Sequence, residues 1–155
     1  MDNKGVSPVV GVMLMLVATI VLAAVVSSYT GTFSPKEKTP SASLTAEASY
    51  SKGYIRLDHV SGDVIYKSTI KIRIETSRPA TSGYVNMSNV TFTPNPDLLR
   101  PGDTAYIYFT KGPYGAEFTG PDISLSVPIG DKFKITIIDT DTGNPIWSSE
   151  LIMNP

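Results

Sequence analysis

The sequence contains no cysteine and a single histidine, His59, among its 155 residues. Without cysteine the fold has no disulfides, and thiolate metal sites and thiol nucleophiles are excluded. One histidine cannot supply a multi-histidine metal site and gives little basis for a Ser-His-Asp triad. A nucleophile motif such as G-x-S-x-G is also missing. We therefore expect no enzymatic activity and no bound cofactor or metal.

The sequence also lacks a long basic run, and its 13 Lys and Arg residues are balanced by 14 Asp and Glu residues. A nucleic-acid partner is therefore not expected.

The charges are unevenly placed, and none occurs between Gly5 and Pro35. Residues 9–26 are apolar apart from Gly11 and Thr19. As a helix they would span roughly 27 Å, close to the hydrocarbon thickness of a bilayer. The sequence thus predicts a membrane-crossing helix.

The helix is expected over residues 6–30. Ser7 followed by Pro8 favours a helix start, and Gly31 and Pro35 are suitable stops. Small side chains recur along it at intervals of four residues, and such side chains let helices approach closely. A plain membrane anchor also contains some small residues, so that alternative stays open. The expected assembly positions are Gly11, Thr19, Ala23, Ala24, Ser27 and Ser28.

The apolar run has three possible roles: a cleaved secretory signal, a permanent anchor, or a helix retained after cleavage in front of it. An ordinary signal has a shorter apolar stretch followed by a small-residue cleavage site. Here Ala23 and Ala24 lie too deep inside the run for such a site. Lys4 and Gly5 directly precede the run. The anchor and the retained helix both remain open on composition.

Residues 31–43 are rich in Gly, Pro, Ser and Thr and predict a linker. Short strand patterns follow, and Ile70, Ile72 and Ile74 alternate with charged residues as in a strand with one buried face. Gly and Pro separate the strands, which predicts an antiparallel, immunoglobulin-like β-sandwich over residues 44–155. The expected strands are residues 44–50, 54–59, 69–75, 84–92, 104–110, 123–127, 133–139 and 146–153.

Three other segments admit a structural and a functional interpretation. His59 beside acidic residues is interpreted as a hydrogen-bonded turn histidine rather than an acid-base group. Residues 139–150 echo an EF-hand calcium loop, but the fifth position is Gly143, so a hairpin turn is favoured. Residues 111–122 predict a Gly- and Pro-rich loop whose rings, Tyr114 and Phe118, either contact a partner or pack on the sandwich. Tyr106 and Tyr108 share one side of their strand, and they too either contact a partner or pack on the sandwich.

Two N-x-[ST] acceptor motifs lie close together, one beginning at Asn86 and the other at Asn89. Neither has proline in the middle position. In an exported protein these motifs are candidate N-glycosylation sites.

Three motifs resemble those of archaeal type IV pilins. The segment KGVSPVVGVMLM at residues 4–15 resembles the KG-VSPVIGVILM signature at the start of these proteins. Residues 58–63, DHVSGD, resemble the family's H-x-G-G-D motif through His59, Gly62 and Asp63, with Ser61 in place of its first glycine. Pro101, Gly102 and Asp103 resemble its later "pGd" turn. We interpret both later motifs as turns, in which Asp accepts backbone hydrogen bonds and Gly takes positive φ.

The resemblance implies that prepilin peptidase cuts between Gly5 and Val6, which makes residues 1–5 a class III signal and leaves the helix on the mature chain. Bacterial pilins usually carry Glu where this chain has Val10, a departure that matches the archaeal branch. The resemblance further implies a homopolymer, built by the pilus assembly machinery from a membrane-inserted precursor. The expected function is an adhesive extracellular filament. An archaeal flagellar filament subunit and a monomeric membrane-anchored binding module are the alternatives.

Overall fold

The computed structural model describes residues 6–30, 38–121 and 124–155, which belong to two compact units. The first unit contains one helix, α1 (Val6–Thr30), with the predicted bounds. No proline follows Pro8 in the helix, and the place of Pro8 in the first turn costs no hydrogen bond.

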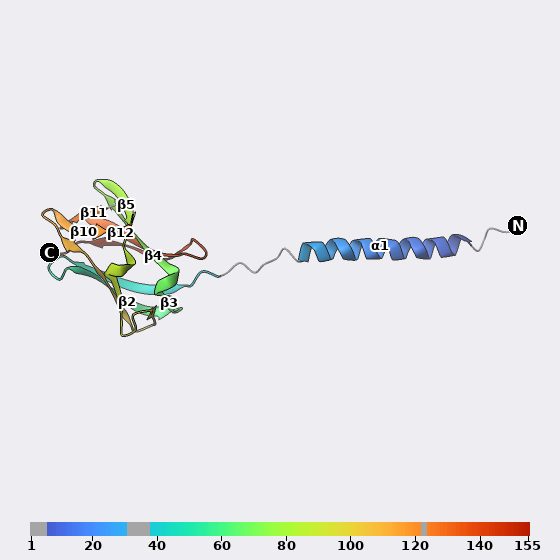
Figure 1. The fold of residues 1–155 in the computed structure, drawn as a ribbon, viewed down its shortest axis with the longest axis horizontal. Helices are drawn as coiled ribbons and strands as arrows, with labels where there is room; N and C mark the ends of the chain where they lie inside the picture. Colours follow the sequence, from blue (N-terminus) through green and yellow to red (C-terminus); the bar gives the residue numbers. More distant parts are fainter. Residues whose placement is uncertain (1–5, 31–37, 122–123) are drawn as a thin grey trace. The chain divides into compact units, whose positions relative to one another are not determined.

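The second unit is built from antiparallel strands (Figure 1). One four-stranded sheet has the order β1-β2-β8-β6, and another has the order β13-β12-β4-β5. Smaller sheets are formed by β11-β10-β9 and by β3-β7. The strand bounds are β1 Ala42–Ser49, β2 Tyr54–Gly62, β3 Ile65–Tyr66, β4 Ile70–Ser77, β5 Ala80–Tyr84, β6 Val90–Thr93, β7 Leu98–Leu99, β8 Thr104–Tyr108, β9 Thr110–Lys111, β10 Gly115–Thr119, β11 Ser124–Pro128, β12 Lys132–Asp139 and β13 Pro145–Ile152.

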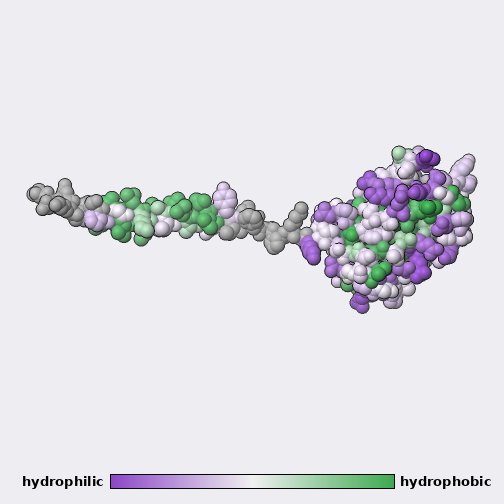
Figure 2. Space-filling view, turned by 180° about the vertical axis from the view of Figure 1, so that it is seen from behind, coloured by the Kyte–Doolittle hydropathy of each residue, from purple (hydrophilic) through white to green (hydrophobic). Residues whose placement is uncertain are grey.

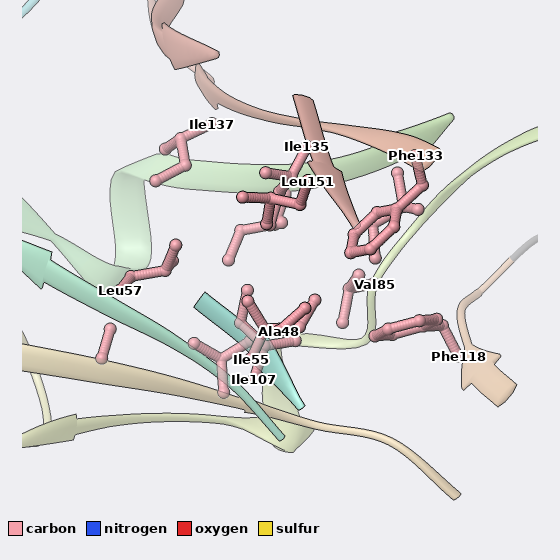
Figure 3. Close-up of a cluster of buried hydrophobic side chains, with 14 of the residues drawn as sticks. Ala48, Ile55, Leu57, Val85, Ile107, Phe118, Phe133, Ile135, Ile137 and Leu151 are labelled. Atoms are coloured by element: carbon pink, nitrogen blue, oxygen red, sulfur yellow. The ribbon is translucent and has the colours of Figure 1, made fainter. Parts of the chain in front are cut away.

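The two four-stranded sheets enclose one apolar core (Figure 3). Ile55 and Ile107 point from one sheet toward Ile135 and Leu151 of the other. Each strand contributes every second side chain, because successive residues of a strand face opposite sides. In β4 the predicted isoleucines at 70, 72 and 74 are buried, and so is Thr76. The predicted β-sandwich after an N-terminal helix is therefore confirmed, while its immunoglobulin-like strand arrangement stays a prediction.

The end of the chain ties the two sheets together along one side. Asn154 pairs with Ser49 at the end of β1. The Tyr50 amide donates to the Asn154 carbonyl at 2.7 Å, and the Asn154 amide donates to the Ala48 carbonyl at 3.2 Å. These bonds satisfy backbone groups at an edge that would otherwise be open to pairing with another chain.

One strand prediction and one loop prediction were wrong. The predicted strand over residues 84–92 is broken, because β5 ends at Tyr84 and a short 3-10 turn, η3 (Met87–Asn89), precedes β6. The segment 111–122 is not a simple loop, since it contains the end of β9 and the whole of β10. Its glycine at 115 serves a strand: an added Cβ would lie 2.1 Å from the Val127 carbonyl oxygen of β11. The Gly and Pro content therefore suggested a loop, although Gly115 is needed in β10 so that the backbone of β11 can approach closely.

Candidate functional site

The exposed apolar surface of α1 is the first candidate site. All side chains from Pro8 to Tyr29 are exposed and none is charged. Figure 2 shows apolar residues along the visible face of the helix. These 22 residues are long and apolar enough to cross a membrane. Exposed apolar surfaces of this extent mark membrane or protein contacts.

The polar and small residues of α1 suit apolar surroundings. The Thr19 hydroxyl donates to the Leu16 carbonyl at 2.8 Å, so its hydrogen bond is made within the helix. A Cβ added at Gly11 would meet nothing within 4 Å, so the subunit itself does not require glycine there. The predicted assembly residues Gly11, Thr19, Ala23, Ala24, Ser27 and Ser28 all lie exposed on α1. Their contact with sister helices stays a prediction.

The predicted cleavage site falls at the limit of the described structure. Gly5 lies outside the described residues, and Val6 is the first residue of α1. Cleavage between them stays a prediction.

The two pilin-like motifs of the sandwich meet in space, although the first lies mostly in strand β2 rather than in a turn. The His59 amide donates to the Asp103 carbonyl at 3.0 Å, and the Gly102 amide donates to the His59 carbonyl at 2.7 Å. Asp103 also closes its own turn, because its Oδ2 accepts from the Arg100 amide at 3.0 Å. Residues 100–103 therefore form a turn. Nothing in the sequence signalled that it would bind the other motif.

His59 itself is a buried residue of strand β2, so its interpretation as a turn histidine was wrong. Its side chain is buried, and Nε2 lies 3.1 Å from the Ser61 carbonyl oxygen. Nδ1 has no hydrogen-bond partner among the described residues. The neighbouring Asp58 faces the other side of β2, where it accepts from Arg56 and from Thr104. The Asp58 carboxylate is therefore not placed to act with His59 as an acid-base pair.

Gly62 and Asp63 hold the chain where it enters the sandwich. The Ser41 amide donates to Asp63 Oδ2 at 3.0 Å, and the Asp63 amide donates to the Ser41 carbonyl at 2.8 Å. Gly62 has φ of +114°, and an added Cβ would lie 2.3 Å from the Ser41 carbonyl oxygen. Only glycine combines this backbone conformation with this close approach.

The turn between β12 and β13 holds the same entering segment. Asp139 is buried, and its Oδ2 accepts from the Thr142 amide and hydroxyl at 3.0 and 2.6 Å. The Thr142 hydroxyl lies 2.9 Å from the Thr39 hydroxyl, to which the Asn144 amide group donates at 3.1 Å. The segment is thus a hairpin turn, as favoured, and its carboxylate is engaged by the turn. We call residues 39–41, with the turns at 62–63 and 139–144, the junction.

The aromatic residues divide between core and surface. Phe118 is buried, and its ring centroid lies 5.2 Å from that of Phe109, so the packing interpretation holds for it. Tyr114 is 83% exposed. On the outer side of the first sheet, Tyr106 contacts Tyr54 edge to face, with centroids 5.1 Å apart, and neighbours Tyr108. Such cross-strand pairs stabilise the sheet.

The two candidate glycosylation residues occupy different environments. Asn86 is exposed beside η3, and Asn89 is half-buried at the end of η3. Modification of either residue stays a prediction.

Comparison with known proteins supports the resemblance seen at the start of the chain. Residues 4–44 match the family model described as archaeal type IV pilin, N-terminal. An uncharacterised protein of Archaeoglobus fulgidus is 31% identical over 152 residues, which cover 94% of this chain and 90% of that protein. The matched family segment spans α1 and reaches into β1.

Proposed function

Because this chain belongs to the archaeal type IV pilin family, we propose that it is the structural subunit of an adhesive surface pilus. The family is structural, and membership implies a filament of identical subunits. The adhesive role, the cleavage between Gly5 and Val6, and the use of prepilin peptidase and pilus assembly machinery are the further parts of the proposal.

The observation that carries the proposal is the complete exposure of α1. A single subunit leaves the whole uncharged surface from Pro8 to Tyr29 uncovered. A bilayer can cover it in the precursor, and sister helices can cover it in a filament. The helix is apolar nearly all round, as is needed when neighbours contact it from several sides. Small residues on it would permit close helix approach and van der Waals packing.

The sandwich would then form the outer part of the filament and contact other surfaces. Its backbone is paired along the β1 side, and its core is complete within one subunit. A folded domain of this kind can be displayed repeatedly without depending on neighbours for its own stability. Extracellular exposure and cell contact are further parts of the proposal.

The test compares the same substitution at two positions that one subunit exposes equally. Val17 on α1 is 56% exposed, and Val60 on the sandwich is 57% exposed. Lysine at the centre of a membrane helix costs roughly 3 kcal/mol on insertion scales, which a long apolar segment withstands. Val17→Lys should therefore still reach the membrane. In a dry bundle of helices, however, each subunit would bury an unpaired charge, so we expect its filaments to be lost.

Electron microscopy of surface filaments, with membrane and filament fractions quantified, measures both variants. Val60→Lys should assemble like the parent. Normal filaments from Val17→Lys would refute assembly through α1. A mature chain that retains residues 1–5, with no filaments from the parent, would instead establish the monomeric membrane-anchored module.

A further inference from the structure

The two N-x-[ST] motifs are adjacent in sequence but differ in how the fold holds them. The first, Asn86-Met87-Ser88, lies in the turn between β5 and β6. The second, Asn89-Val90-Thr91, runs from that turn into β6. A transferase must grip the acceptor residue and the hydroxyl residue two positions later, so the second motif requires part of a strand to leave the sheet.

The first motif is already presented in a form that an enzyme can grip. Asn86 is exposed, and its Oδ1 accepts from the Ser88 amide at 3.1 Å, which brings the acceptor side chain over its hydroxyl residue. Across the described part of the chain, no hydrogen bond engages Asn86 Nδ2, the atom that would be glycosylated. Ser88 is exposed as well.

The second motif is held by the fold at each of its three positions. Asn89 is half-buried, and its Nδ2 donates to the Thr119 hydroxyl at 3.3 Å. Val90 is 1% exposed in the core and pairs with Ile107, while Thr91 pairs with Tyr106 of β8. Glycosylation at Asn89 would therefore require that β6 detach and Val90 leave the core.

A groove lies directly beside the first acceptor. It has a volume of about 480 Å³ and is lined by Lys71, Tyr84, Val85, Asn86, Met87 and Pro121. The Lys71 ammonium lies 5.9 Å from the Tyr84 ring centroid. The lining therefore combines an aromatic ring and apolar side chains with a cation, which suits the C–H faces and hydroxyl edges of a sugar. A saccharide on Asn86 would meet this groove with its first residues.

We propose that Asn86, and not Asn89, carries an N-linked saccharide whose first sugars occupy this groove. In the transfer step, Asn86 Nδ2 forms a bond to the anomeric carbon of a polyprenol-phosphate-linked oligosaccharide. The bond from that carbon to the phosphate oxygen breaks, the lipid phosphate leaves with the electron pair, and Nδ2 loses one proton. The inference rests on the proposed function, since the donor and its transferase act on exported chains.

The acceptor is tested by removing each hydroxyl residue and leaving both asparagines in place. Ser88→Ala and Thr91→Ala are a matched pair at exposed positions. The full-length protein would be purified from surface filaments or membranes of its native host, and intact mass and glycopeptide mapping would locate the saccharide. We expect the parent and Thr91→Ala to carry it at Asn86 and Ser88→Ala to carry none. A saccharide at Asn89, or a bare polypeptide in the parent, overturns the assignment.

The groove is tested by a double-mutant cycle on the melting temperature in detergent. If the saccharide packs on Tyr84, the glycosylated parent should melt higher than Ser88→Ala, and that difference should vanish when both proteins carry Tyr84→Ala. An undiminished difference, or none in the parent background, overturns the groove. The N-terminal residue of the same samples, Val6 or an earlier one, reports on pilin processing independently of the saccharide.

Discussion

Substitution of Gly62 by alanine tests whether the junction is a fixed attachment. A Cβ at this position would lie 2.3 Å from the Ser41 carbonyl oxygen and 2.7 Å from the Ala42 Cα. Both are backbone atoms, so no flexible side chain can move aside. The segment must therefore shift and lose the two hydrogen bonds that join Ser41 to Asp63.

Gly102→Ala is the matched control. Gly102 has φ of +95° and Gly62 has φ of +114°, so alanine is strained at both positions. A Cβ at Gly102, however, would meet nothing within 4 Å. The conformational cost, about 1 to 3 kcal/mol, is common to both variants. The extra cost at Gly62 is the loss of two surface hydrogen bonds, about 1 kcal/mol each.

Thermal unfolding of the full chain in detergent measures the difference. With about 4 °C per kcal/mol for a domain of this size, Gly62→Ala should melt about 8 °C below Gly102→Ala. Equal melting temperatures would refute the reasoning, because they would mean that the Ser41–Asp63 attachment contributes nothing to the stability of the sandwich.

Two further predictions concern stability, measured in the same assay. Phe118→Ala should lower the free energy of unfolding by about 3 to 5 kcal/mol, because the ring is buried in the core. Tyr114→Ala, at an 83% exposed position, should change it by less than about 0.5 kcal/mol. Equal effects would show that this segment is a surface loop. Asp139→Ala should lower the free energy of unfolding by about 2 kcal/mol, because its bonds to Thr142 are lost, while substitution of the exposed Asp141 by alanine should change it little. A calcium chelator should leave the parent's melting temperature unchanged. A melting temperature that depends on the chelator would restore the calcium interpretation.

The junction gives the pilin-like turn motifs a physical role. Gly62 and Asp63 do not form a ligand site with His59; they fasten the chain as it enters the sandwich, while His59 fastens the other turn through Asp103. The two hydrogen bonds between Ser41 and Asp63 hold the chain just before β1 against the end of β2.

Much of this protein was predictable from the sequence because the signals are local. The absence of charge between Gly5 and Pro35 determined α1 and its apolar surface, since a helix needs only its own residues to satisfy its backbone. The alternation in residues 70–75 determined β4 and its buried face. The turn at residues 139–144 followed from Asp and Gly at short spacing.

Tertiary structure decided what depends on residues far apart in the chain. The Phe118 ring packs near the rings of Phe109 and Phe133, and a Gly- and Pro-rich segment gave no periodicity from which to predict this burial. The bond between the Thr39 and Thr142 hydroxyls joins residues 103 positions apart, and the contact of His59 with Asp103 joins strand β2 to the turn that precedes β8. Periodicity reports which face of an element is buried, but not which distant element covers it. That choice is made only when the whole core packs at once.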